Sequence, residues 1–196
     1  MENQHKKKNR RPKFKLLNRV FHALHTILKR KPTNTAHVVT KEIYEEAEIP
    51  SRTYKENFGD VDDVIQYANE EFIDVFDLYS GKVPSQKPNL AGVFRVLLSR
   101  LRGHEEAVNI VIDRFDNNVM REAIERIKPI ITFGWENRYT MNSRRRMLEE
   151  YTDWFFWILR EWVETGMPVE TVEEHARKLS RLHEHVEAGG KNLGGI

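Results

Sequence analysis

The chain has 196 residues, of which 39% are hydrophobic and 32% charged, so it can bury the core of one or two ordinary domains beneath a strongly charged surface. It contains no cysteine, which excludes disulfides, thiolate catalysis and cysteine-based zinc sites. No run of about 18 apolar residues occurs, and the lysine-rich start lacks the apolar region of a secretory signal. We therefore expect a cytoplasmic protein with no membrane partner.

The net charge of +2 is distributed unevenly. Residues 1–31 contain eleven lysines and arginines against one glutamate, a net of +10, and the remaining residues sum to −8. A basic arm on an acidic body favours a polyanionic partner, first of all nucleic acid, although a solubilising tail has the same composition. We assign residues 1–13 to a flexible arm that either follows a minor groove or adds nonspecific attraction to DNA.

Apolar residues recur three and four positions apart almost throughout, which is the periodicity of amphipathic helices and predicts an all-α fold with about nine helices. Pro129 should kink or end the seventh of them, and Ser143 should cap the eighth. The glycine-rich residues 189–196 are expected to form a flexible tail. The predicted helices cover residues 14–31, 38–47, 52–58, 61–79, 90–101, 107–115, 119–133, 143–166 and 169–188.

The segment 36–58 carries the most information about function. Ile43, Ala47 and Ile49 lie at the offsets where a short helix and the turn after it face inward, and Phe58 anchors a second short helix. That second helix is mainly polar, and its side chains are donors of the kind that contact base edges and phosphates. The candidate DNA contacts are Thr40, Lys41, Ser51, Arg52, Thr53, Tyr54, Lys55 and Asn57.

Three of these candidates have alternatives that the sequence leaves open. Arg52 either contacts DNA, at a base or at a phosphate, or is a solvated surface arginine. Thr40 binds phosphate together with Lys41 at the helix start, caps the helix, or does both. Thr53 either touches the DNA backbone or packs against the preceding helix.

The run of residues 40–58 resembles the DNA-binding module of TetR-like transcriptional regulators in the spacing of Ile43, Ala47, Ile49, Thr53 and Phe58. The segment 159–174 looks like the late part of the ligand domain in that family, where the last helices form the dimer interface.

The resemblance implies a three-helix helix-turn-helix DNA-binding domain at residues 14–60 and a larger helical effector-binding and dimerisation domain at residues 61–188. It further implies a dimeric repressor that a small molecule releases from an operator. The chain departs from the family pattern at three places: Glu48 stands at the turn position usually given to glycine, Lys55 replaces an aromatic residue, and aspartates surround Val61 where a basic residue is common.

Aromatic side chains of the larger domain either line an effector cavity or form ordinary core. The candidate pocket residues are Phe72, Phe76, Phe94, Phe115, Trp135, Tyr139, Tyr151 and Phe155. The helix over residues 143–166 has more large apolar side chains than one buried face needs, so a second copy of the chain is expected to cover it. The candidate dimer residues are Trp154, Ile158, Trp162, Val172, Ala176, Leu179 and Leu182.

No pattern points to an enzyme, a metal or a cofactor. The sequence lacks a phosphate-binding glycine loop and a Gly-x-Ser-x-Gly turn, and its histidines have no carboxylates at metal-ligand spacing. We expect a sequence-specific DNA-binding regulator. The alternative is a helical DNA-binding adaptor or nucleoid-associated protein that acts through protein partners without a small-molecule ligand.

Overall fold

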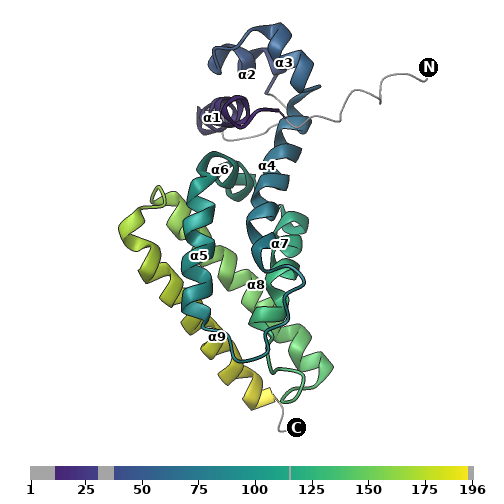
Figure 1. Cartoon of the computed structure of the whole chain (residues 1–196), viewed down its shortest axis with the longest axis vertical. Coiled ribbons are helices and arrows are strands. Elements are labelled where there is room, and N and C mark those ends of the chain that lie inside the picture. The colour runs from purple at the N-terminus through teal and green to yellow at the C-terminus, as the bar shows by residue number, and fades with distance from the viewer. Residues whose placement is uncertain (1–11, 31–37, 115, 194–196) are drawn as a thin grey trace, which may run out of the picture. The chain divides into compact units, whose positions relative to one another are not determined.

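The structure, a computed structural model, describes residues 12–30, 38–114 and 116–193. Every regular element in these residues is helical, which confirms the predicted all-α class. Most of the predicted basic arm, Phe115 and the last three residues lie outside the described residues. The elements are α1 (Phe14–Arg30), α2 (Thr40–Glu46), α3 (Ser51–Asn57), α4 (Val61–Phe76), η2 (Asp77–Tyr79), α5 (Leu90–Gly103), α6 (Glu105–Arg114), α7 (Asn117–Ile131), α8 (Met141–Glu164), η3 (Val169–Thr171) and α9 (Val172–Leu193) (Figure 1).

The chain divides into two compact units, Met1–Ala68 and Asn69–Ile196, and the division falls inside α4 rather than before it. The first turns of α4 belong to the N-terminal unit because their apolar side chains pack into the core of that unit. Val64 and Ala68 are buried, and the ring of Tyr67 packs edge-on against Phe58 with 5.9 Å between ring centroids. The expected boundary at residue 60 therefore precedes the observed division.

The N-terminal unit is built on α1, which has the amphipathic pattern expected from the sequence. One stripe of this helix, which includes Val20, Phe21 and Leu24, is buried, and α2 packs against α1. A helix of seven residues such as α2 or α3 is not stable alone, so packing against α1 and α4 must hold both in place.

The C-terminal unit consists mainly of long helices, and α9 lies along both α5 and α8 (Figure 1). Its core contains a cluster of aromatic rings in which Phe155 lies 6.2 Å from Phe76, 6.1 Å from Phe94 and 6.1 Å from Tyr151, measured between ring centroids. All four side chains have no exposed surface. The structure thus gives these candidate pocket residues the alternative role, that of core packing, because rings at helical spacing fill the space between helices.

The end of α9 is fastened to the segment between α7 and α8 through Glu187. Its carboxylate accepts hydrogen bonds from Trp135 Nε1 at 3.1 Å and from the Arg138 guanidinium at 2.7 Å. Its main-chain oxygen accepts a third bond from the Tyr139 hydroxyl at 3.1 Å. Trp135 and Tyr139, also candidate pocket residues, therefore belong to this structural contact.

Three local details differ from the expectation. The helix cap of α8 is Thr140, whose side chain accepts a hydrogen bond from Ser143 N at 3.2 Å, so Ser143 itself lies in the first turn. Pro129 lies in the last turn of α7, where its missing N–H removes one bond of the helix, and α7 ends two residues later at Ile131. Finally, α9 continues through Gly189 and Gly190, so the expected tail is helical as far as Leu193.

In the part of the chain that the structure describes, none of the helices combines the length and the apolar character needed to cross a bilayer.

Candidate nucleic-acid interface

The turn between α2 and α3 has a left-handed backbone at Glu48, the position where the sequence pattern leads one to expect glycine. Glu48 has a φ of +50°, in the left-handed region, which glycine adopts more readily than other residues. Its N–H donates to Glu45 O at 3.1 Å, and Ile49 N donates to Tyr44 O at 3.0 Å. These two bonds form a Schellman motif, which ends α2 abruptly and lets α3 begin at Ser51.

Arg19 of α1 stabilises this turn from outside. Its guanidinium donates to Ala47 O at 2.6 Å and to Glu48 O at 2.8 Å, so two carbonyls at the end of α2 are satisfied. Arg30 makes a bidentate ion pair with Glu46, in which Nη1 donates to Oε2 at 2.8 Å and Nη2 donates to Oε1 at 3.1 Å. The sequence analysis counted both arginines in the net positive charge of residues 1–31, because a charge count does not reveal an internal partner.

Two aromatic side chains anchor α3. Tyr54 has no exposed surface, Phe58 is 2% exposed, and their ring centroids lie 5.0 Å apart. The Tyr54 hydroxyl donates to Asp60 O at 3.2 Å, and burial, followed by the charges of nearby aspartates, raises the pKa of Tyr54. Tyr54 is therefore corrected from a candidate DNA contact to a core anchor, since its ring and its hydroxyl are both used inside the unit.

The outer side of α3 is polar. Arg52 is 89% exposed, and its Nε donates to Glu56 Oε1 at 2.7 Å, one turn along the helix. This hydrogen bond with Glu56, more than its charge, raises the pKa of Arg52. Lys55 is exposed and takes part in no ion pair within the described residues, while Thr53 is half-buried. The outer side of α3 therefore offers an ammonium group and an ion-paired guanidinium.

The remaining candidates lie at the edges of this surface. Thr40 is the first residue of α2, after Val39, so it does not cap that helix. Lys41 is exposed, and its Nζ lies 3.6 Å from Glu45 Oε1 in an ion pair along the helix. Ser51 is half-buried at the start of α3, and Asn57 Nδ2 donates within the helix to Thr53 O at 2.8 Å.

The aspartates after Phe58 have a structural role. Asp60 Oδ1 accepts from Asp63 N at 3.0 Å, and Asp63 Oδ2 accepts from Gly59 N at 2.6 Å. The two carboxylates thus cap the first turn of α4, where negative charge is also favoured by the helix dipole. This explains why aspartates occupy positions where the family pattern would have a phosphate contact.

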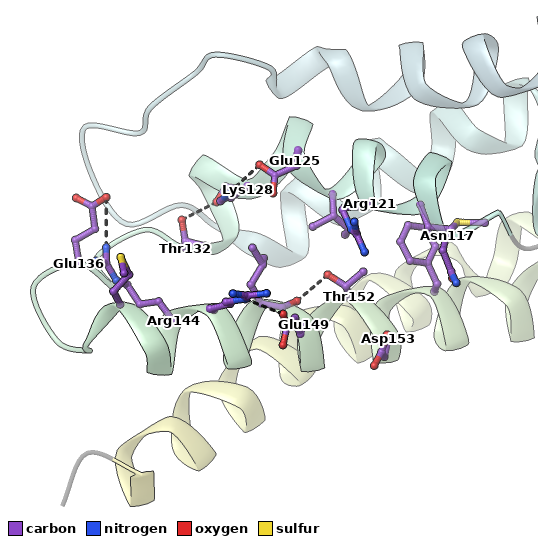
Figure 2. Close-up of a pocket in the computed structure, with 16 residues that line it drawn as sticks. Asn117, Arg121, Glu125, Lys128, Thr132, Glu136, Arg144, Glu149, Thr152 and Asp153 are labelled. Carbon is purple, nitrogen blue, oxygen red and sulfur yellow. Dashed lines mark hydrogen bonds and ion pairs between the residues drawn. The ribbon is translucent and has the colours of Figure 1, made fainter.

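A second candidate site is a groove between α7 and α8 in the C-terminal unit, with a volume of about 910 Å³ (Figure 2). Its apolar floor is made by Met120, Ile124, Leu148 and Phe156, and its walls carry four cationic and four anionic side chains. Of the eight aromatic residues expected to form an effector pocket, Phe115 lies outside the described residues, and none of the other seven lines the groove. The lining residues are Asn117, Met120, Arg121, Ile124, Glu125, Lys128, Thr132, Glu136, Met141, Arg144, Arg145, Leu148, Glu149, Thr152, Asp153 and Phe156.

A third feature is a pair of exposed tryptophans on α8. Trp154 is 48% exposed and Trp157 57% exposed, and their rings meet edge to face with 5.7 Å between centroids. We call these two residues the tryptophan pair. Sequence reasoning named Trp154 but missed Trp157, although its position three residues later on a helix places it on the same face.

The other candidate dimer residues lie inside their own chain. Trp162, Ala176 and Leu179 have no exposed surface, and Ile158, Val172 and Leu182 are at most 8% exposed. They pack within the C-terminal unit, in which α8 lies against α9, and are therefore corrected from interface to core. Periodicity identifies a buried stripe but not whether the same chain or a second copy covers it.

Within the described ranges, no three histidine, aspartate or glutamate side chains gather in a way that could hold a metal ion. Neither a protein-family model nor a curated protein matches the chain. Its function is therefore argued from the geometry of these sites.

Proposed function

We propose that the chain is a sequence-specific DNA-binding transcriptional regulator in which α2, the turn at Glu48 and α3 act as a helix-turn-helix. The observation that carries the proposal is the way α3 is held: Tyr54 and Phe58 fix its inner side, and Arg52 and Lys55 stand on its outer side. A recognition helix needs this combination, because it must be rigidly positioned yet present donors to the major groove.

Arg52 and Lys55 have different roles in this proposal. Arg52 can donate two hydrogen bonds to a guanine, provided that it exchanges Glu56 for the base. That exchange costs little, because an exposed ion pair of this kind is worth about 0–1 kcal/mol. Lys55 serves as a point charge for a phosphate, which sets the position of the helix rather than its sequence preference.

The regulator is proposed to act as a homodimer through the tryptophan pair. Two large exposed aromatic residues on one helix face are unusual for a monomer surface, and a two-fold axis would bury both pairs against each other. Replacement of Trp154 and Trp157 by glutamate should convert a dimer to a monomer in sedimentation velocity. A dimer that persists in this double variant would contradict the assignment.

The test of DNA recognition is a random-pool binding selection with the purified chain and with Arg52→Ala and Lys55→Ala. Loss of a base contact at Arg52 should weaken binding to the selected site by about 5–150-fold and relax the preference at one base pair. Loss of a phosphate contact at Lys55 should weaken binding to all sequences and reduce its salt dependence.

The chain offers matched controls for both variants. Arg160 pairs with Glu164 four residues later at 2.7 Å, the same geometry as Arg52 with Glu56, but lies in the C-terminal unit. Lys82 is an exposed lysine of that same unit. Arg160→Ala and Lys82→Ala should leave DNA binding unchanged. If Arg52→Ala and Lys55→Ala behave like these controls, α3 does not read DNA.

Glu56→Gln tests the proposal in the opposite direction. Removing this carboxylate frees Arg52 and removes a negative charge from the proposed DNA-facing side, so affinity for DNA should rise several-fold at low salt. A fall in affinity would indicate that Glu56 itself contacts a base, as glutamate does with cytosine.

Regulation by a small molecule is proposed in preference to the adaptor alternative because the C-terminal unit contains a groove of about 910 Å³. The two recognition helices of a dimer must lie about 34–36 Å apart, or a multiple of this, to enter one face of the duplex. A ligand that binds better to another spacing would lower DNA affinity by the ratio of its affinities for the two states.

A further inference from the structure

We propose that the α7–α8 groove binds a small amphipathic carboxylate, with the carboxylate on Arg121 and the apolar body on the groove floor. The site itself is argued from the groove alone. Its role as the effector site rests on the proposed function.

The charges of the groove select an anion. Three of its four cations are already paired: Lys128 with Glu125 at 2.8 Å, Arg145 with Glu149 at 3.1 Å, and Arg144 with Glu136 at 3.7 Å. Arg121 has no such partner among the described residues. Figure 2 shows its side chain extending from α7 toward α8. The guanidinium is therefore the one groove cation with all its donors available, and a carboxylate is its natural bidentate partner.

Arg144 adds a second, weaker attraction at the other end of the groove. Its Nε is buried and has no hydrogen-bond partner, although its outer nitrogen reaches Glu136. A buried donor without an acceptor costs free energy, so a ligand oxygen or a water at this end would satisfy it. We place the head group at Arg121 because Arg144 already shares its charge with Glu136.

Asp153 is the groove anion without an ion pair in the described residues. It is exposed and forms no ion pair with Arg121, but its negative charge repels an anionic ligand. This predicts that the ligand carries a single negative charge.

The floor sets the apolar part of the ligand. Met120, Ile124 and Phe156 line the groove and are at most 2% exposed, and Leu148 is half-buried and lines it with them. Leu148 and Phe156 are eight residues apart on α8, which corresponds to about 12 Å along the helix axis. An unbranched chain of medium length fits this span, and the groove volume lies in the range of small-molecule sites.

The experiment is calorimetric titration of the full chain with octanoate and octylammonium below their critical micelle concentrations, and with octanol below its solubility limit. Octanoate should bind several-fold more tightly than octylammonium, since only the anion can use Arg121, and the exposure of this guanidinium limits the gain. Arg121→Gln should lower octanoate affinity up to about fivefold and leave octanol affinity unchanged. Asp153→Asn should raise octanoate affinity.

Two further variants keep the result interpretable. Arg160→Gln, an exposed arginine on α8 outside the groove, should change nothing. Leu148→Ser should weaken octanoate and octanol alike, because it removes apolar floor. Equal affinities for octanoate and octylammonium, or octanoate binding that ignores Arg121→Gln, would overturn the site.

The regulatory role is measured separately, as the change in DNA affinity when octanoate is added. Weaker DNA binding that depends on Arg121 supports the effector role. Unchanged DNA affinity with intact octanoate binding overturns that role and leaves the site standing. If the chain binds no DNA at all, the proposed function fails, while the titrations still decide the site.

Discussion

The two units of the chain hold their helices in different ways. In the N-terminal unit the seven-residue α3 depends on two aromatic anchors, Tyr54 and Phe58, and on a turn held by Arg19. In the C-terminal unit, helices of up to 24 residues share an aromatic cluster in which Phe155 alone contacts four other rings. The comparison teaches that a short, exposed helix is held by few side chains, so single substitutions should affect the first unit more locally and more severely.

The two units can be observed separately. All four tryptophans, at positions 135, 154, 157 and 162, belong to the C-terminal unit. Tryptophan fluorescence therefore reports unfolding of that unit alone, whereas circular dichroism reports both.

The largest effect is expected for Tyr54→Ala. Loss of a completely buried ring should cost about 3–5 kcal/mol, comparable with the whole stability of a small unit. Circular dichroism should show an early thermal transition with no matching change in tryptophan fluorescence. Tyr54→Phe, which removes only the bond to Asp60 O, should cost about 1 kcal/mol. Simultaneous loss of both signals in Tyr54→Ala would mean that the units do not unfold independently.

Glu48→Gly should stabilise the N-terminal unit by about 0.5–1 kcal/mol. A side chain at a φ of +50° costs about 1–2 kcal/mol, part of which is offset by the greater chain entropy of unfolded glycine. The matched control is Glu45→Gly within α2, which should destabilise by about 1 kcal/mol. Denaturant midpoints from circular dichroism measure both, and equal signs for the two variants would contradict a left-handed turn at Glu48.

A pH effect is expected from the C-terminal unit. His183 is buried, its Nε2–H donates to Ile131 O at 2.7 Å, and its ring stacks 5.7 Å from Trp135. Burial lowers the pKa of His183, opposed by the Ile131 bond and by Glu187, and assisted by Lys87 and Arg138. Below pH 6.5, about the ordinary pKa of histidine, His183 of the unfolded chain therefore binds a proton more readily than His183 of the folded chain.

Stability should consequently fall as pH drops from about 6.5 through the lowered folded pKa of His183, and level off below it. Unfolding midpoints followed by tryptophan fluorescence should show this slope in the natural chain and a reduced slope in His183→Gln. The exposed neighbour His185 is the control, since His185→Gln should retain the slope. Equal slopes in both variants would assign the effect to other groups.

The smallest effect is expected for Tyr151→Phe. The Tyr151 hydroxyl is buried and has no hydrogen-bond partner, so its removal should be neutral or stabilising by up to about 1 kcal/mol. This is the counterpart of Tyr54→Phe, the same chemical change with the opposite expected sign. Destabilisation in both would indicate that an ordered water satisfies Tyr151.

The helices could be predicted from the sequence because their apolar residues repeat at helical spacing. The turn at Glu48 could be predicted because Ile43, Ala47 and Ile49 have the spacing of inward-facing residues in a short helix and the turn after it. The ends of the helices were less predictable. The cap of α8 is Thr140 rather than Ser143, two residue types that cap equally well, and the continuation of α9 through Gly189 accompanies the long-range contacts of Glu187. Tertiary contacts override local preference at such positions.

The candidate sites were predicted unevenly for a similar reason. Arg52 and Lys55 could be proposed from the sequence because residue type and motif position single them out. Arg121 could not be proposed in this way, because four cations and four anions on two helices look like ordinary solvated surface until their pairing is known. Tyr54 was assigned to the wrong side of α3 because a tyrosine is both a donor and a core residue.

The contacts of Glu187 have a practical consequence for the C-terminus. Three donors from residues 135–139 converge on this single residue near the end of α9. An affinity tag or fluorescent label appended after the last residue should thus leave the fold intact, whereas a stop codon at position 187 should release the end of α9 and increase its proteolysis. The shortest stable version of the chain is expected to include Glu187.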